Sequence, residues 1–306
     1  MFGHFKDWSR NLPTNRASFI QWRVLVVYSP YEVPLLKNND ILLLVKNRNL
    51  YFLSWATHCD CVSVYRSQKP RFLRLAAWMV KHNLPFKGWL LGSWKHELKR
   101  YKQVIFLDFG FEPFMASYVR KHFDHQMILF FWNVMDHDRY ALIQHLSALQ
   151  TIDDFYTFSS HDARQYGLRY NSTFYVKSQT VPVPPLEYDV FYGGTNRGRE
   201  AKILELARAF SALNLRVHLH TTEFETQKNE TYVSYTDYLQ LTLQSRSILE
   251  VMKEHQTGVT LRSMEAIHFK RKLITTNLTI TEYKFYHPNN IFVVGIDDIH
   301  DLPEFL

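Results

Sequence analysis

The chain is poor in cysteine, with only Cys59 and Cys61 among its 306 residues. Two cysteines are too few for a disulfide framework, and a bridge within a C-x-C pair is strained, so we expect both to be reduced. The sequence also lacks any run of about 20 uncharged apolar residues, so we expect no membrane-spanning helix. Charged residues at Lys6, Asp7 and Arg10 interrupt the apolar core that a secretory signal needs. We therefore expect a reduced, cytoplasmic protein.

Acidic residues are scarce near the start of the chain. Residues 1–102 contain 17 Lys and Arg against 5 Asp and Glu, whereas residues 181–306 contain 13 against 16. A net charge of +7 spread this unevenly indicates different partners for the two halves. The basic half suits nucleic acid, an anionic membrane surface or a phosphorylated substrate. Apolar residues make up 46% of the chain, which is enough for a packed core and argues against disorder.

Apolar runs of strand length alternate with helical patterns along the chain. We expect strands at residues 24–28, 41–45, 51–55, 104–107, 127–132, 154–158, 188–192, 216–221, 272–277 and 292–294, and helices at 71–94, 113–123, 138–149, 200–213 and 239–255. Such alternation predicts parallel, doubly wound sheets in an α/β fold. Three prolines within residues 178–185 indicate a linker. The sequence thus predicts two Rossmann-like domains, residues 20–180 and 186–306.

A glycine-bearing turn follows the expected strand at residues 188–192 and opens the next helix. It contains Gly193, Gly194, Arg197, Gly198 and Arg199. A parallel sheet presents backbone amides to a phosphate at such a place, aided by the helix N-terminus. The two arginines add planar donors suited to a diphosphate. The alternative is an ordinary strand-to-helix turn whose glycines only supply tight backbone angles.

A second turn and short helix run from Gly258 to the strand at residues 272–277. Glu265 lies about one turn into this helix, where an ionised carboxylate can accept both hydroxyl hydrogens of a ribose. Arg262 and the amides from Gly258 to Thr260 would reach the phosphates. The alternative is a solvated glutamate on an amphipathic helix. Because both turns follow strands of one α/β unit, we expect them at the same carboxyl edge, where ligands bind.

Both turns resemble the donor-binding domain of GT-B glycosyltransferases. In that family, this domain contains a Gly-Arg/Lys-Gly turn and an E-G-x-G-L-x-x-x-E-A block. The matching residues are Gly194, Arg197 and Gly198 in the first, and Gly258, Leu261, Glu265 and Ala266 in the second. The resemblance covers about residues 188–295 and is closest to bacterial enzymes of lipopolysaccharide, capsule or exopolysaccharide synthesis. It implies two domains facing a cleft, transfer from a nucleotide diphosphate sugar to a lipid-linked or polysaccharide acceptor, and no required metal.

The chain departs from that family pattern at two positions. Thr257 stands where the family has its first glutamate, and Thr260 stands where it has its second glycine. In the family the first glutamate is usually linked to the donor sugar. The donor sugar and the retaining mechanism therefore stay open. A non-catalytic partner subunit with the same fold is an alternative of a different class.

The basic front half is the expected acceptor domain. Residues 71–102 contain eight Lys and Arg, one Glu and three Trp. A basic helix edged with Trp and Leu is typical of a membrane surface, with rings at the headgroup level and cations on anionic lipid. The alternative is a core helix with a solvated basic face. We expect peripheral binding to the inner face of the plasma membrane. We expect no nucleic-acid partner, because no nucleic-acid-binding signature occurs.

Several acidic and histidine residues follow strands of the front half. Asp108 and His161 are the candidate catalytic residues, and Asn133 is a comparable candidate at another strand end. Asp136 and Asp138 form a D-x-D pair, which in GT-A glycosyltransferases holds a divalent metal on the sugar diphosphate. The alternative for Asp138 is a helix cap. No Ser-His-Asp arrangement or G-x-S-x-G motif indicates a hydrolase.

Overall fold

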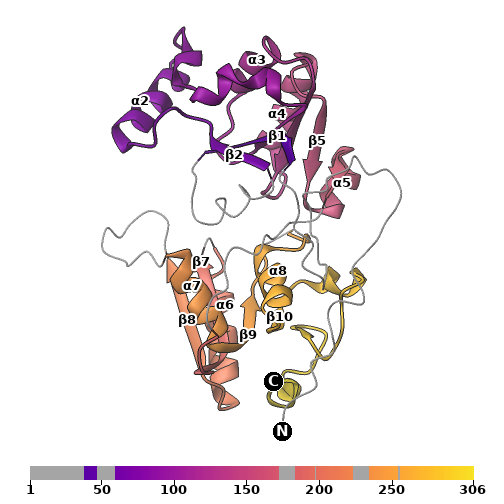
Figure 1. Cartoon of the computed structure of the whole chain (residues 1–306). Coiled ribbons are helices and arrows are strands. Elements are labelled where there is room, and N and C mark those ends of the chain that lie inside the picture. Colours follow the sequence, from indigo (N-terminus) through magenta and orange to yellow (C-terminus); the bar gives the residue numbers. More distant parts are fainter. Residues whose placement is uncertain (1–37, 47–58, 172–182, 197, 223–233, 254–255) are drawn as a thin grey trace. The chain divides into compact units, whose positions relative to one another are not determined.

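The computed structural model describes residues 38–46, 59–171, 183–196, 198–222, 234–253 and 256–306 (Figure 1). The chain divides into two compact units, one of Tyr31–Ser172 and one containing Thr173–Leu306. Each unit holds a parallel sheet flanked by helices, in a Rossmann-like arrangement. The expected α/β class with parallel sheets is confirmed. The strands expected at residues 24–28 and 51–55 lie outside the described residues.

The sheet of the first unit has the strand order β2-β1-β3-β4-β5-β6, and all its pairs are parallel. The strands are β1 (Asn38–Val45), β2 (Cys59–Ser63), β3 (Gln103–Leu107), β4 (Gln126–Phe131), β5 (Asp154–Thr157) and β6 (Arg169–Tyr170). From β1 the chain moves outward to β2 and then returns to β3 on the other side. The carboxyl ends of β1 and β3 therefore form a topological switch point.

Helices α2, α3 and α4 pack on one face of this sheet. Alternate strand residues, among them Leu44, Phe106 and Leu129, form one core with Ala76 of α2 and Met115 of α3. The elements are α2 (Pro70–Lys81), η3 (Lys87–Leu90), η4 (Ser93–His96), η5 (Leu98–Arg100), α3 (Pro113–Arg120), α4 (His137–Ala148) and α5 (Ser160–Tyr166). The two-residue periodicity of the buried strand residues thus fixes which face meets the helices.

The expected helix at residues 71–94 is wrong beyond its first three turns. Helix α2 begins with Pro70, whose fixed φ suits a first helical position, and it ends at Lys81. Asn83 and Phe86 then adopt positive φ angles of 47° and 62°. Pro85 lies between them, and a proline disfavours the helical conformation of the residue before it. Short 3-10 helices follow in place of a longer α-helix.

The sheet of the second unit has the order β11-β10-β9-β7-β8 and is also fully parallel. Its strands are β7 (Tyr188–Thr195), β8 (Val217–Thr222), β9 (Ser245–Glu250), β10 (Lys272–Thr275) and β11 (Ile291–Val293). Neighbouring residues of β9 face opposite layers: Ile248 packs with Ala266 of α8, and Leu249 packs with Phe210 of α6. This sheet is therefore covered on both faces.

The helices of the second unit correct one sequence expectation. They are α6 (Glu200–Ala212), α7 (Tyr235–Leu243), α8 (Leu261–His268), η6 (Leu278–Glu282), η7 (Ile299–Asp301) and α9 (Leu302–Phe305). The helix expected at residues 239–255 is wrong, because α7 ends at Leu243 and β9 occupies residues 245–250. The segment lies between β7 and β10, and pairing on both sides overrides the local helical preference.

Candidate functional site

The two sequence-predicted turns meet at the switch point of the second unit. From β7 the chain moves outward to β8 and then returns to β9 on the other side of β7. The carboxyl ends of β7 and β9 thus lie side by side, and helix α8 begins just beyond β9. Ligands of parallel α/β sheets bind at such a crevice, near a helix N-terminus.

Arg262, in the first turn of α8, joins this helix to the end of β7. Its Nε donates a hydrogen bond to the carbonyl oxygen of Gly193 at 3.0 Å, and its Nη2 contacts the same oxygen. The guanidinium lies 5.0 Å from the centre of the Tyr192 ring. Gly194 has a φ of 146°, and a Cβ atom there would collide with the guanidinium. Only glycine at position 194 therefore allows this close approach.

A buried carboxylate at the end of β9 holds the start of α8. Glu250 is 1% exposed and accepts hydrogen bonds from the hydroxyls of Thr260, Ser263 and Thr275. Thr260 is also the N-cap of α8 and accepts from the backbone N–H of Arg262 at 3.1 Å. Sequence analysis missed Glu250, although an acidic residue within the apolar run at residues 248–251 is a signal of this kind.

Glu265 joins α8 to α7 and does not face solvent. Its carboxylate accepts hydrogen bonds from the hydroxyl of Tyr235 at 3.0 Å and from that of Tyr238 at 2.6 Å. The residue is 0% exposed, and burial raises the pKa of Glu265 to about 7, against the opposing effects of Tyr238, Tyr235 and Arg262. The solvated glutamate is therefore wrong. A ribose would reach this carboxylate only after the two tyrosines moved aside.

Among the expected diphosphate ligands of the first turn, Arg199 has other partners. The guanidinium of Arg199 donates to the carbonyl oxygens of Asn196, Thr195 and Val251. It therefore ties the end of β7 to the chain that leaves β9. Gly198 has a φ of 80° in the turn before α6. Arg197 lies outside the described residues.

Thr257 and Gly258 lie in the loop between β9 and α8. The carbonyl oxygen of Thr257 accepts from the hydroxyl of Thr279 at 3.0 Å. The side-chain amide of Asn277 lies 3.5 Å from the carbonyl oxygens of both Thr257 and Gly258. This part of the loop is thus held by the segment that follows β10. Gly258 is buried, and the residue that follows it, Val259, belongs to the hydrophobic core.

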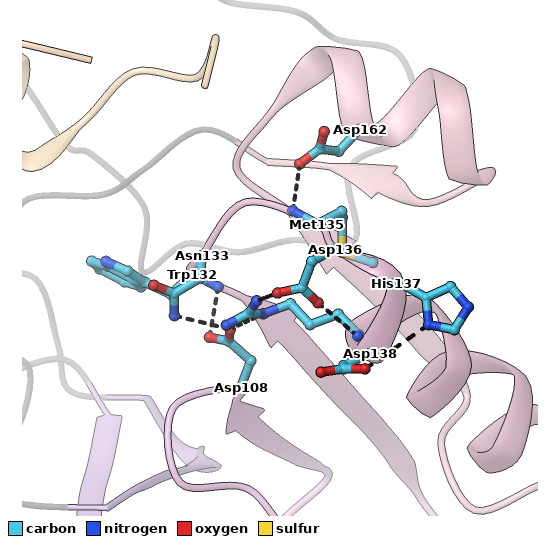
Figure 2. Close-up of polar contacts among 9 residues, drawn as sticks. Asp108, Trp132, Asn133, Met135, Asp136, His137, Asp138 and Asp162 are labelled. Carbon is cyan, nitrogen blue, oxygen red and sulfur yellow. Dashed lines mark hydrogen bonds and ion pairs between the residues drawn. The ribbon is translucent and has the colours of Figure 1, made fainter. Parts of the chain in front are cut away.

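Asp108 and Asn133 come together at the carboxyl ends of β3 and β4 in the first unit (Figure 2). The Asp108 carboxylate accepts from the Trp132 backbone N–H at 2.9 Å, from the Asn133 side-chain amide at 3.0 Å and from Arg139 Nε at 3.1 Å. Its side chain is 4% exposed. Both Asp108 oxygens thus serve a network that fixes the strand ends.

The D-x-D carboxylates have separate partners, as Figure 2 shows. Asp136 is the N-cap of α4: it accepts from the Arg139 backbone N–H at 2.9 Å and pairs with the guanidinium of that residue. The Asp138 side chain is fully exposed beside His137. The cap foreseen for Asp138 is thus made by Asp136. Within the described part of the chain, no group of three or more potential metal-ligating side chains occurs.

His161 lies in the first turn of α5, with a half-exposed side chain. Its Nδ1 is 3.5 Å from Asp162 Oδ1, and the other oxygen of Asp162 accepts from the backbone N–H of Met135 at 3.1 Å. The carboxylate beside His161 is therefore that of Asp162 and not that of Asp108, the other candidate catalytic residue.

No helix among the described residues is long and apolar enough to cross a membrane.

Comparisons with known proteins leave the chain without an assigned family. No protein-family model matches it, and no curated protein does. Among solved structures, it is similar to the NAD+-bound 3-phosphoglycerate dehydrogenase of Entamoeba histolytica, with 10% identity, coverage of 87% of this chain and 89% of that chain, and a TM-score of 0.22. A likeness at that level supports no conclusion about function.

Proposed function

We propose that the chain is a GT-B-like glycosyltransferase that moves a sugar from a nucleotide diphosphate sugar to a lipid-linked or polysaccharide acceptor. The observation that carries the proposal is the contact of Arg262 with Gly193. It joins the two turns that the sequence marked independently, at the switch point where parallel sheets bind ligands. The proposal includes two units facing a cleft, with Tyr31–Ser172 on the acceptor side.

The donor diphosphate would bind between the end of β7 and the N-terminus of α8. A helix N-terminus offers backbone N–H donors and the positive end of the helix dipole. Arg262 adds a fixed cation with several donors at the same place. As the bond to the sugar breaks, negative charge grows on the diphosphate, and these positive groups would stabilise it without a metal.

Arg199 and Glu265 position other groups of the site and do not bind the donor in this proposal. Arg199 positions the strand ends through three carbonyl oxygens, so Arg262 is the arginine assigned to the diphosphate. Glu265 holds α8 against α7 through Tyr235 and Tyr238. It is therefore a positioning residue, and the ribose is assigned to groups at the rim of the β7 and β9 ends.

Nucleotide binding tests the proposal directly. Calorimetric titration of the full chain with UDP, GDP and CDP should give saturable binding of at least one nucleotide. Arg262→Ala should weaken that binding by about tenfold to a hundredfold, the range for a charge-assisted hydrogen bond. Arg246→Ala is the matched control, because Arg246 lies at the amino end of β9, with its side chain paired to Asp189.

The same titrations have an outcome that rejects the proposal. Absence of binding for all three nucleotides would do so, and equal weakening by Arg262→Ala and Arg246→Ala would remove Arg262 from the site.

Incubation with nucleotide sugars then separates the two classes of function. Release of the nucleotide diphosphate identifies an enzyme, whereas binding without donor consumption identifies a non-catalytic partner. Thr257, in place of the family carboxylate, is the feature that favours the second outcome.

A further inference from the structure

Large apolar side chains gather on the exposed side of α2 and the turn that follows it. Leu75 and Trp78 of α2 are 42% and 52% exposed, and Phe86 and Trp89 just beyond are 86% and 49% exposed. The opposite side of α2 packs on the core through Ala76. We call these four side chains, together with the cations Arg66, Arg71, Arg74 and Lys81, the α2 surface. Burial in the first unit does not account for them, because each is at least two-fifths exposed.

The segment that forms the α2 surface is also basic and has no acidic residue of its own. No Asp or Glu occurs between Asp60 and Glu97, while this interval contains Arg66, Lys69, Arg71, Arg74, Lys81, Lys87 and Lys95. Residues three, four and seven apart share one side of a helix, so Arg71, Arg74 and Lys81 flank Leu75 and Trp78. Cations and large apolar side chains therefore share one exposed helix face.

Aromatic contacts extend this surface from α2 to the following turn. The Trp89 ring lies 5.7 Å from that of Phe72 on α2, measured between ring centroids. The Arg66 guanidinium lies 4.8 Å from the centre of the Trp89 ring. Trp89 thus sits between a helix side chain and a cation, which holds the turn after α2 against the helix.

Phe86 is the most exposed of the four side chains, and its backbone is unfavourable for its type. Its φ of 62° and ψ of 23° lie in the left-handed region, which glycine adopts freely and a bulky residue rarely does. The ring gains little from burial, since 86% of the residue is accessible. Neither backbone preference nor packing explains a phenylalanine here, which points to a partner outside the chain.

We infer that the α2 surface docks on an anionic lipid bilayer. Leu75, Trp78 and Phe86 would enter the boundary between headgroups and acyl chains, and the cations would lie at the level of the lipid phosphates. The presence of apolar side chains among the cations favours a bilayer over nucleic acid, because a phosphate backbone gives Leu75 and Phe86 no apolar phase to enter. This inference stands independently of donor binding, which concerns the other unit.

Phe86→Gly separates membrane binding from folding. Flotation of the full chain with vesicles of phosphatidylglycerol and phosphatidylcholine should recover the wild type at low salt. High salt or pure phosphatidylcholine should abolish recovery, because the cations are exposed. Phe86→Gly should weaken partitioning by about tenfold or more, as one large apolar side chain no longer enters the bilayer. Its melting temperature should equal or exceed the wild-type value, since glycine suits the left-handed backbone.

Two control variants match the apolar and electrostatic changes. Leu149→Ser removes an exposed apolar side chain at the end of α4 and should leave partitioning unchanged. Arg71→Gln with Arg74→Gln should weaken partitioning by about fivefold for each cation removed. Arg208→Gln with Lys284→Gln lowers the net charge equally outside the α2 surface and should have little effect.

Three results would overturn the inference. The first is no recovery with anionic vesicles at low salt. The second is unchanged partitioning of Phe86→Gly, which would exclude apolar insertion. The third is a duplex oligonucleotide that displaces the protein from vesicles and binds Phe86→Gly as well as wild type, which would assign the surface to nucleic acid. Because donor titration uses no vesicles, failure of either proposal leaves the other measurable.

Discussion

Glu250→Ala is expected to lower the free energy of unfolding by about 3–5 kcal/mol, because it leaves three hydroxyl groups without their shared acceptor inside the protein. Thr260, Ser263 and Thr275 all donate to this carboxylate, which is 1% exposed. Removing one partner of a buried polar cluster costs the desolvation of the groups that remain. Equilibrium unfolding in urea, followed by far-UV circular dichroism, measures the loss.

Two matched variants make the Glu250 prediction specific. Glu250→Gln retains one carbonyl acceptor at nearly the same volume, so its loss should fall between zero and that of the alanine variant. Glu205→Ala removes an exposed glutamate of α6 that pairs with Lys202, and should change stability by about 0.5 kcal/mol or less. If Glu250→Ala were as stable as Glu205→Ala, the hydroxyl cluster would not anchor α8.

The same substitution should also act on the proposed donor site. Glu250 holds the N-cap of α8 through Thr260 and the first helical turn through Ser263. Without it, the N-terminus of α8 loses its attachment to β9. The position of the helix amides relative to the end of β7 therefore depends on Glu250 as well as on the contact of Arg262 with Gly193.

Sequence reasoning succeeded where the pattern was local. The runs behind β3 and β7 are apolar and short, and α6 shows helical spacing, so their type follows from the residues alone. The prediction is wrong at β9, because the local pattern predicts a helix for Ser245–Glu250. Strand formation there depends on pairing with β7 and β10, which no local pattern reveals. Because Glu250 belongs to this strand, the sequence also does not predict that its carboxylate holds the start of α8.

The candidate residues show the same division. Gly193 and Arg262 belong to separate turns of the sequence, and their contact spans 69 residues and follows only from strand order. Asp108 and Asn133 were selected as strand-end residues, and the parallel pairing of β3 with β4 explains why they meet. The sequence does not indicate Arg139 as a member of this network, because no local pattern shows that a helical arginine contacts Asp108 at the end of a strand.

The buried carboxylate of Glu265 should make the protein less stable as pH rises through the weakly acidic range. Burial raises the pKa of Glu265 from its usual 4.5 to about 7. Between these values the folded state keeps the proton that the unfolded state has lost. Stability therefore falls by about 1.4 kcal/mol per pH unit across this window, about 3 kcal/mol in all. The contribution is complete below pH 4.5 and is lost above about pH 7. The nearby Tyr238 stays protonated throughout, because its pKa is raised well above 10, first by burial and then by Glu265.

Comparison with Glu265→Gln isolates this single titration. The amide introduced by this substitution is not ionisable, so any constant cost of placing it beside Tyr235 and Tyr238 shifts the whole stability curve of the variant without adding a slope. The free energy of unfolding of wild type minus that of Glu265→Gln should therefore decrease by about 3 kcal/mol between about pH 4.5 and 7.5. The pKa of Asp189 is lowered because, against the opposing effect of burial, Arg216 and Arg246 favour its charged form, and this effect is common to both proteins and cancels. Parallel stability curves would show that the Glu265 carboxyl titrates as an exposed glutamate does, and would place it at the surface of the turn, within reach of a ribose.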